Sequence, residues 1–317
     1  MPRLGEKIAT RDAYGNALVR LGEHNRAIVV LDADLAKSTK TIKFKSKFPE
    51  RFFDMGIAEA DMMGTAAGLA ASGKIAFAST FAIFATGRAW EQIRNSICYT
   101  NLNVKIAATH AGIGVGPDGS SHQSIEDIAI MRVIPNMKVV VPADAVETEK
   151  AVAALVETPG PAYLRLGRSG VPVVYDESYT FALGKASVLR EGSDVAIIAV
   201  GVMAQLALAA AEILSNDGIN ARVINMSTIK PIDRDAIISA ASETGAIVTA
   251  EEHNVIGGLG SAVSEVVCET LPVPVLKVAI RDTFGQSGEP DELMAFYGLT
   301  AGNIAETARE AVSRKAT

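Results

Sequence analysis

Residues 54–73 read DMGIAEADMMGTAAGLAASG and decide how the first half of the chain is organised. Small and apolar residues dominate from Ala58 onward, which predicts a helix that packs closely against its neighbours and is ended by Gly73. Glu59 falls at the start of this helix, where the helix dipole and the free N–H groups stabilise a carboxylate. A helix-terminal acid is therefore the simplest interpretation of Glu59, and the rest of the sequence decides whether it has a chemical role as well.

The composition is that of a globular protein with a large hydrophobic core. The chain has 317 residues, 49% of them hydrophobic, but no apolar run as long as the roughly eighteen residues that span a bilayer. The net charge of −6 argues against nucleic acid as the main partner, and the first residues lack the apolar core of a signal peptide. Cys98 and Cys268 lie far apart, so we expect neither a disulfide framework nor a zinc site. These features indicate a cytoplasmic protein with no membrane partner.

Short apolar runs alternate with helical patterns between residues 10 and 166. The runs predict strands at Ala27–Leu31, Ile75–Ser79, Val104–Thr109, Lys138–Val141 and Ala162–Leu166. Helices are expected at Thr10–Glu23 (with Thr10 as N-cap), Ala58–Ser72, Thr86–Cys98, Ser124–Val133 and Ala145–Glu157. Continuously apolar strands between helices are typical of a buried parallel sheet covered on both faces, and ligands of such sheets bind at the carboxyl ends of the strands.

The same alternation resumes after residue 192. Residues 167–192 are rich in glycine, proline and polar side chains and are interpreted as a connection. Strands are then expected at Val195–Val200, Ala221–Asn225, Ala246–Ala250 and Val275–Ala279, and helices at Ala204–Ser215, Arg234–Glu243 and Ser261–Glu269. Asp233 is the predicted N-cap of the second of these helices. The sequence therefore predicts an α/β protein with two doubly wound, mostly parallel-sheet domains, residues 1–183 and 184–317.

A glycine-rich loop follows the predicted strand Val104–Thr109. It reads HAGIGVGPDGSSHQ over residues 110–123, so its backbone can approach a ligand closely, and His110 and His122 frame it. One interpretation is a metal site made of His110, Asp118 and His122, which lack the compact spacing of metal ligands. Another is a structural loop with incidental histidines. A nucleotide phosphate loop is not indicated, because neither a Walker pattern nor a Gly-x-Gly-x-x-Gly motif opening a helix is present.

Several motifs together resemble the transketolase family of thiamine-diphosphate enzymes. They are Gly-Ile-Ala-Glu at residues 56–59, Thr-Phe-x-x-Phe at residues 80–84, and Thr-His-x-x-Ile-Gly-Val-Gly-x-Asp-Gly-x-x-His-Gln at residues 109–123. Phe-Gly-Gln-Ser-Gly at residues 284–288 and Tyr-Gly-Leu-Thr at residues 297–300 resemble the end of that family. The resemblance covers nearly the whole chain. It implies the pyrimidine-binding domain of the family followed by its C-terminal domain.

The resemblance also implies how a cofactor is held. In this family a glutamate hydrogen-bonds the aminopyrimidine ring of thiamine diphosphate, and the match places this catalytic and cofactor-binding role on Glu59. We expect Glu59 to lie in an apolar, water-poor site. Phe81 and Phe84 would pack on the pyrimidine ring, because flat apolar faces hold a flat ring without competing for its hydrogen bonds. The family often has another aromatic residue one turn later, but Gly87 stands at that position, which leaves Trp90 as the candidate replacement.

A site for sugar phosphates is implied in the same way. The family positions that hold the substrate phosphate are matched by Arg11, Ser38, His110 and Arg168. Asp118 matches a position that hydrogen-bonds a sugar hydroxyl, and His122 one that contacts the substrate near the cofactor. His110 and His122 are therefore also candidate catalytic residues. Guanidinium groups suit a phosphate, although Arg11 and Arg168 taken alone would be read as surface charges.

One half of the cofactor site is missing from the sequence. The family holds the diphosphate through Mg²⁺ on a Gly-Asp-Gly stretch followed by an asparagine, and this chain contains no Gly-Asp-Gly. Asp34 would approach only the middle portion of the cofactor. The resemblance thus implies the small subunit of a split transketolase that moves a two-carbon ketol unit between sugar phosphates. It would require a larger partner chain that holds Mg²⁺, and would self-associate within a heterotetramer.

Three alternatives remain open at this point. The β chain of 2-oxo-acid dehydrogenase E1 is similar in size and fold, and deoxyxylulose-phosphate synthase shares much of the loop at residues 110–123. A non-catalytic, transketolase-like binding subunit is the alternative outside the enzyme class. The donor and acceptor sugars are not predicted, and His253 is given no role.

Overall fold

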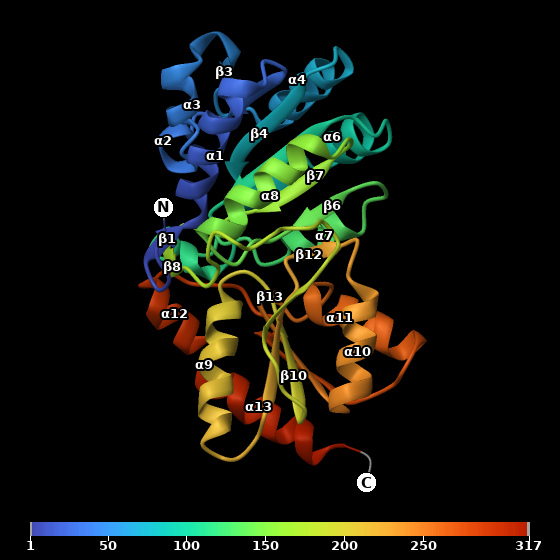
Figure 1. Cartoon of the computed structure of the whole chain (residues 1–317). Helices are drawn as coiled ribbons and strands as arrows, with labels where there is room; N and C mark the ends of the chain where they lie inside the picture. The colour runs from blue at the N-terminus through green and yellow to red at the C-terminus, as the bar shows by residue number, and fades with distance from the viewer. Residues whose placement is uncertain (1, 316–317) are drawn as a thin grey trace.

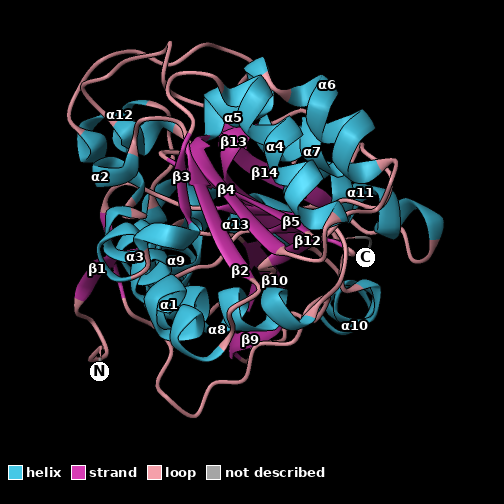
Figure 2. Ribbon diagram, turned by 90° about the horizontal axis from the view of Figure 1, so that it is seen from above, coloured by secondary structure: helices cyan, strands magenta, loops and turns pink. Residues whose placement is uncertain are grey.

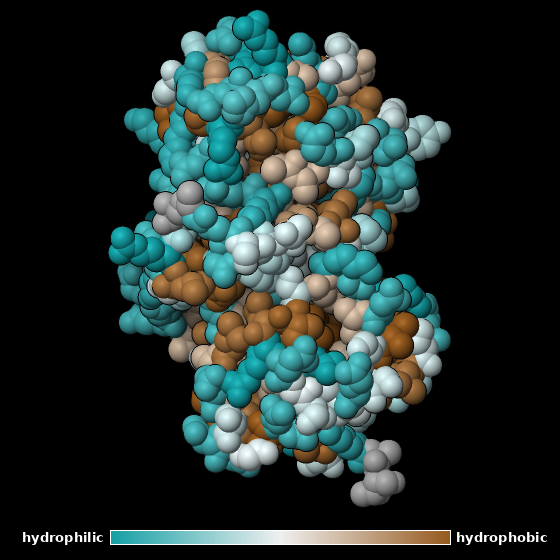
Figure 3. All heavy atoms as spheres, in the orientation of Figure 1, coloured by the Kyte–Doolittle hydropathy of each residue, from teal (hydrophilic) through white to brown (hydrophobic). Residues whose placement is uncertain are grey.

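The computed structural model describes residues 2–315, which fold around two β-sheets in an upper and a lower lobe (Figure 1). Hydrophobic side chains on the visible face gather near the level where the two lobes meet (Figure 3). Within the described residues, no helix combines the length and the apolarity that crossing a membrane requires.

The upper sheet has seven strands. Their spatial order is β12 (Thr228–Lys230), β6 (Lys138–Val140), β7 (Ala162–Arg165), β5 (Val104–Thr109), β4 (Ile75–Phe81), β2 (Ile28–Asp32) and β3 (Phe52–Asp54). All neighbouring strands are parallel except β12 and β6. The mostly parallel sheet predicted from the apolar runs is thereby confirmed.

Helices cover both faces of the upper sheet (Figure 2). One face carries α1 (Thr10–His24), α3 (Ile42–Lys47) and α8 (Ala145–Glu157), and the other carries α4 (Glu59–Ala71), α5 (Ala82–Arg88) and α7 (Asp127–Arg132). Side chains along β2 alternate between the two faces, because Ile28 and Val30 pack with the first set of helices while Val29 and Leu31 pack with the second. Burial on both faces is the reason that the strand sequences are apolar throughout.

The lower sheet has five strands. Their order is β14 (Val275–Ile280), β13 (Ile247–Asn254), β10 (Val195–Ala199), β11 (Ala221–Asn225) and β9 (Ser187–Arg190), and only β9 runs antiparallel to its neighbour. α9 (Met203–Ser215) and α13 (Ala301–Ser313) cover one face, and α10 (Arg234–Thr244) and α11 (Leu259–Glu269) the other. Asp233 caps α10 as predicted, since its side chain accepts a hydrogen bond from the Ala236 N–H.

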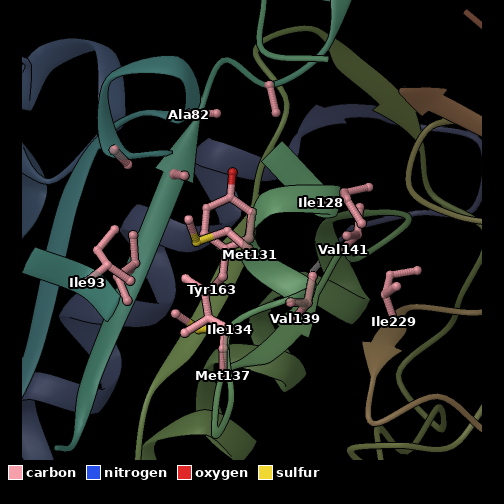
Figure 4. Packing of buried hydrophobic residues seen from close by; sticks show 14 of the residues in the cluster. Ala82, Ile93, Ile128, Met131, Ile134, Met137, Val139, Val141, Tyr163 and Ile229 are labelled. Carbon is pink, nitrogen blue, oxygen red and sulfur yellow. The ribbon is translucent and has the colours of Figure 1, made fainter. Parts of the chain in front are cut away.

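The two lobes share a core. β12 lies in the second half of the sequence but pairs with β6 of the upper sheet. Its Ile229 packs in the same buried cluster as Val139 and Val141 (Figure 4). This cluster extends into the lower lobe through α10 and α11.

The starts or caps of three predicted helices differ from the structure. The helix expected at Ser124–Val133 begins three residues later, at Asp127. Thr10 is not the N-cap of α1: that position is Ala9, and the Thr10 hydroxyl instead accepts a hydrogen bond from the Gly167 N–H at 2.8 Å. The helix expected at Thr86–Cys98 begins earlier, at Ala82, because the chain turns into α5 directly at the end of β4. It breaks at Ala89 and continues as α6 (Trp90–Gln92) and the π-helical turn η2 (Ile93–Cys98).

Several short elements are not predicted from the sequence. They are β1 (Lys7–Ala9), α2 (Ala36–Thr39), α3, η1 (Pro49–Arg51), β3, η3 (Ile113–Val115), β8 (Gly170–Pro172), β9, β12 and α12 (Pro290–Phe296). Elements of three to seven residues are too short to show a periodic pattern. β1 and β8 form a separate two-stranded antiparallel ribbon, and β8 and β9 lie within the stretch interpreted as a connection. The longer α13 is not predicted either.

Candidate active site

The carboxyl ends of β4 and β5 bring Phe81 and His110 together. The two strands are parallel, and Phe81 pairs in register with Thr109, the residue before His110. The His110 ring stacks on the Phe81 ring with 3.8 Å between ring centres and 23° between the planes. His110 has a left-handed backbone conformation, with φ of 57°, which turns the chain sharply as the strand ends.

Phe84 and His122 extend this stack. The Phe84 ring lies 5.7 Å from the Phe81 ring and is nearly parallel to it, at 13°. The His122 ring meets Phe84 edge to face at 5.3 Å and 73°. Four of the predicted site residues therefore form one aromatic cluster between the β4–α5 turn and the loop at residues 110–123.

Hydrogen bonds fix the tautomer of His110. Arg11 Nη1 lies 3.0 Å from His110 Nε2, and because a guanidinium has no acceptor, Nε2 accepts this bond. The proton is then on Nδ1, which donates to the Thr109 hydroxyl at 2.8 Å. Burial, followed by the charges of Arg11 and Arg168, lowers the pKa of His110 to about 3. His110 is therefore a neutral ring at neutral pH.

Arg11 also ties the segment after β2 to this cluster. Its Nη1 donates to the backbone oxygen of Ser38 at 3.0 Å. Asp32 holds the same segment, because its carboxylate accepts hydrogen bonds from the hydroxyls of Thr39 at 2.6 Å and Thr41 at 2.8 Å. Burial raises the pKa of Asp32 to about 6. The structure thus brings Arg11, Ser38 and His110 to one place.

Arg168 and Asp118 flank the glycine-rich loop. Arg168 Nη1 donates to the Val115 backbone oxygen and lies 3.7 Å from the Asp118 carboxylate. Both side chains are about one-third exposed, at 34% and 36%, so their polar ends remain accessible to a ligand. Together with Arg11, Arg168 makes this rim of the cluster cationic.

Glu59 is the first residue of α4, and Gly73 follows the helix with φ of 88°. The Glu59 side chain is 4% exposed, and its carboxylate accepts hydrogen bonds from Arg88 Nη1 at 3.0 Å and 3.3 Å. The guanidinium carbon of Arg88 lies 4.0 Å from the centre of the Phe84 ring. Arg88, which sequence analysis does not select, therefore connects the buried carboxylate with the aromatic cluster.

Two other predicted positions stand apart from the cluster. Asp34 is exposed, and its backbone N–H donates to the Asp54 side chain at 3.2 Å. The Trp90 indole donates to the Ile130 backbone oxygen at 3.1 Å, which directs it toward α7. Gly87 is exposed, and a Cβ there would meet open space. The structure gives no reason to make Trp90 the missing wall of the ring pocket.

Glu252, at the end of β13, is a residue that sequence analysis misses. Its Oε1 accepts a hydrogen bond from the Gly114 N–H at 2.6 Å, and its carboxylate fills the space that a side chain at Gly112 would need. Its backbone oxygen accepts from Arg165, which forms a buried ion pair with Asp127 at 2.7 Å. The lower lobe thereby holds the backbone of the glycine-rich loop. The sequence signal that could have identified it is the pair Glu251 and Glu252 directly after the apolar run at residues 246–250.

Two observations bear on His253 and on the metal interpretation. His253 is fully buried: its Nε2 accepts from the Ala129 N–H at 3.4 Å and its Nδ1 donates to the Asn254 backbone oxygen at 2.7 Å. It therefore joins β13 to α7. Among residues 2–315, no three His, Cys, Asp or Glu side chains lie close enough together to hold a metal ion. Both ring nitrogens of His110 are already engaged by protein groups.

Comparison with known proteins gives matches to both halves of the chain. Residues 6–173 match the family described as transketolase, pyrimidine binding domain, and residues 184–304 match the transketolase C-terminal domain. A putative transketolase C-terminal section of Methanocaldococcus jannaschii is 49% identical over 308 residues, covering 96% of each chain. A 6-deoxy-6-sulfo-D-fructose transketolase subunit of a Clostridium species is 45% identical, covering 96% of this chain and 95% of that one.

A solved structure is similar over almost the whole chain. It is described as a split gene transketolase, inactive beta4 tetramer, and is 56% identical with a TM-score of 0.91. The match covers 98% of this chain and all of the other.

Proposed function

We propose that this chain, which belongs to the transketolase family as the small subunit of a split transketolase, works in a two-chain, thiamine-diphosphate-dependent enzyme. The proposed reaction transfers a two-carbon ketol unit between sugar phosphates. The observation that carries this proposal is the buried carboxylate of Glu59, which Arg88 links to the stacked rings of Phe81 and Phe84. We place the division between its pyrimidine-binding and C-terminal domains near residue 184.

The residues present fit the aminopyrimidine end of the cofactor. Phe84 already carries a flat, hydrogen-bond-donating group on its face, the Arg88 guanidinium, which also donates to Glu59. An aminopyrimidine is likewise flat and carries a donor edge. When bound, thiamine diphosphate supplies a carbon that loses a proton, adds to a carbonyl group and delocalises the resulting negative charge. Glu59 would accept a hydrogen bond from the ring and exchange a proton with it, while Phe81 and Phe84 exclude water.

The cationic rim suits a phosphorylated sugar. Arg11 and Arg168 offer guanidinium groups to a phosphate, and the Ser38 segment lies beside Arg11. Asp118 would accept a hydrogen bond from a sugar hydroxyl. His110 and His122 would contact the reacting end, and His110 is neutral, so it would hydrogen-bond a hydroxyl or carbonyl without adding charge.

A partner chain and a substrate class complete the proposed function. The sequence offers no Gly-Asp-Gly stretch for Mg²⁺ and the diphosphate, so a larger chain would supply it and complete a heterotetramer. A relative named for 6-deoxy-6-sulfo-D-fructose supports a wider substrate class than pentose phosphates. Cys98 and Cys268 are free thiols, which suits the reducing cytoplasm.

Reconstitution tests the proposal. The chain is purified alone and together with a Gly-Asp-Gly-containing chain encoded beside it. Alone, it should show neither micromolar binding of thiamine diphosphate and Mg²⁺ by calorimetry nor ketol transfer, and the pair should show both. Micromolar binding and transfer by the isolated chain would contradict the half-site. A stable pair without thiamine-dependent transfer would contradict the proposed reaction.

A further inference from the structure

Arg88 lies where the aminopyrimidine ring is proposed to bind. We propose that its guanidinium is a placeholder, which pairs with Glu59 and covers Phe84 in the free subunit and is displaced when thiamine diphosphate binds. Arg88 is thus a positioning residue for Glu59 before the cofactor arrives. This inference rests on the proposed function.

The contacts of Arg88 support the placeholder role. It is the last residue of α5, and one of its terminal nitrogens donates to both Glu59 oxygens, at 3.0 Å and 3.3 Å. The guanidinium carbon is 4.0 Å from the Phe84 ring centre, within the range of a cation–π contact. The planar guanidinium thus contacts both groups that an aminopyrimidine would need, the Glu59 carboxylate and the face of the Phe84 ring.

These contacts exclude the ring. A second planar group cannot stack on this face of Phe84 while the guanidinium is at van der Waals distance from it. The bound ring must also reach the carboxylate that Arg88 now holds. Binding of the cofactor therefore requires Arg88 to move. The apparent affinity for the cofactor is lower than the intrinsic affinity, because only molecules in which Arg88 has left Glu59 can bind it.

Burial explains why the Glu59 carboxylate needs a hydrogen-bonding partner both in the free chain and in the complex. The Glu59 side chain is 4% exposed, so without a partner it would be a buried, unpaired carboxylate, which is costly. The Arg88 side chain is 51% exposed and regains full hydration when it leaves. The carboxylate is thus satisfied by Arg88 in the free chain and by the ring in the complex.

The test uses Arg88→Met, which keeps an apolar stem and removes the charge. In the isolated chain it should lower Tm by about 1–3 °C, and a double-mutant cycle with Glu59→Gln should be non-additive. In the complex reconstituted with the larger chain, calorimetry should show thiamine diphosphate binding about 3- to 10-fold more tightly, as expected from removing a competitor of surface-pair strength. Arg94→Ala is the matched control, since Arg94 is exposed in the following turn and bonds the adjacent Asn95.

The outcomes separate this inference from the proposed function. Unchanged or weaker cofactor binding by Arg88→Met, with normal binding by the wild-type complex, would overturn the placeholder and leave the transketolase proposal intact. An additive cycle in the free chain would also overturn it. A wild-type complex that binds no thiamine diphosphate would instead contradict the proposed function.

Discussion

Glu59 is the residue on which the proposed chemistry depends. Glu59→Gln keeps the size and one acceptor oxygen of the side chain but cannot exchange a proton with the cofactor. We expect turnover of the reconstituted complex to fall by about 10²- to 10⁴-fold, the range for a positioned acid–base group. Asp61→Asn is the matched control, because Asp61 lies in the same first turn of α4 but is exposed. Equal turnover for Glu59→Gln and the wild type would show that Glu59 is only a helix-terminal acid with no role in the reaction.

His110 should make the native state sensitive to acid. Its pKa is about 3 in the folded protein and about 6.5 in an unfolded chain. Between these values the unfolded chain binds a proton that the native state does not, so His110 costs nothing above pH 6.5 and an increasing amount as the pH falls toward 3. The cost reaches about 2 kcal/mol at pH 5.

Denaturant unfolding at pH 7 and pH 5 checks this expectation. The variant is His110→Asn, because asparagine tolerates the left-handed φ of 57° found at this position. The wild type should lose about 2 kcal/mol more than the variant between the two pH values. Equal losses would show that His110 protonates in the native state, and an NMR titration of the ring would then report a pKa near 6.5.

The sequence predicts the aromatic cluster but not Arg88, the residue that links it to Glu59. Phe81, Phe84, His110 and His122 follow from motifs at the carboxyl ends of neighbouring strands, and parallel pairing brings such ends together. Arg88 has no motif of its own, since it contacts Glu59 across 29 residues of sequence. Only the packing of α5 beside α4 reveals this pair.

At the element scale, α4 presents an exposed face almost without side chains. Gly64 and Gly68 are both exposed, and a Cβ at either position would meet nothing within 4 Å. Ile57, just before the helix, is 76% exposed. Glycine in a helix costs stability, so an unpartnered helix would gain from alanine at both positions. The face is therefore suited to a close-packed subunit contact, as expected from the small residues of this helix.

Gly64→Ala and Gly68→Ala should separate folding from assembly. Each should raise the stability of the isolated chain by about 0.5–1 kcal/mol, measured by thermal or denaturant unfolding, because alanine favours the helix. Sedimentation should show weaker assembly with the larger chain or with a second copy. Gly302→Ala near the start of α13, where a Cβ would lie 4.0 Å from the Thr300 hydroxyl oxygen at ordinary van der Waals distance, is the control that should stabilise without affecting assembly. Undiminished assembly of the α4 variants would remove this face from the interface.

Element prediction succeeds where burial is two-sided and fails where elements are short. The strands β2, β4 and β5 are buried along almost their whole length, so their apolar runs are unambiguous. The turn from β4 into α5 leaves no polar break in the sequence, so the start at Ala82 is not visible. The π-helical turn at Ile93–Cys98 likewise keeps a helix-like composition and changes only the hydrogen bonding.

At the scale of the whole molecule, the sequence predicts two α/β units but not how they are joined. β12 crosses from the second half of the chain into the upper sheet, and a three-residue strand leaves no pattern for this. The buried Asp127–Arg165 pair, with Arg165 donating to the Glu252 backbone oxygen, forms a second connection. Such contacts between distant residues follow from tertiary packing alone.

Glu252→Gln tests whether this connection serves the site. The Glu252 carboxylate holds the Gly114 N–H at 2.6 Å, and the amide would keep the shape of the side chain but lose its charge. The glycine-rich loop should then sample other positions. We expect kcat/KM for a phosphorylated donor to fall about 10-fold, because the lost charge-assisted hydrogen bond is worth roughly 1.5 kcal/mol. Affinity for thiamine diphosphate should not change, because the Glu59 side of the site is untouched.

The neighbouring Glu251 supplies the control for this prediction. Its carboxylate is also buried but accepts hydrogen bonds from the Leu259 and Gly260 N–H groups at the start of α11, away from the loop. Glu251→Gln should therefore lower the unfolding free energy while leaving kcat/KM of the folded complex unchanged. If both variants lose stability and neither changes kcat/KM, Glu252 is a structural residue and the lower lobe does not set the geometry of the loop. A loss of activity confined to Glu252→Gln, seen mainly as a raised KM for the donor, would show that the second half of the chain positions groups on the first.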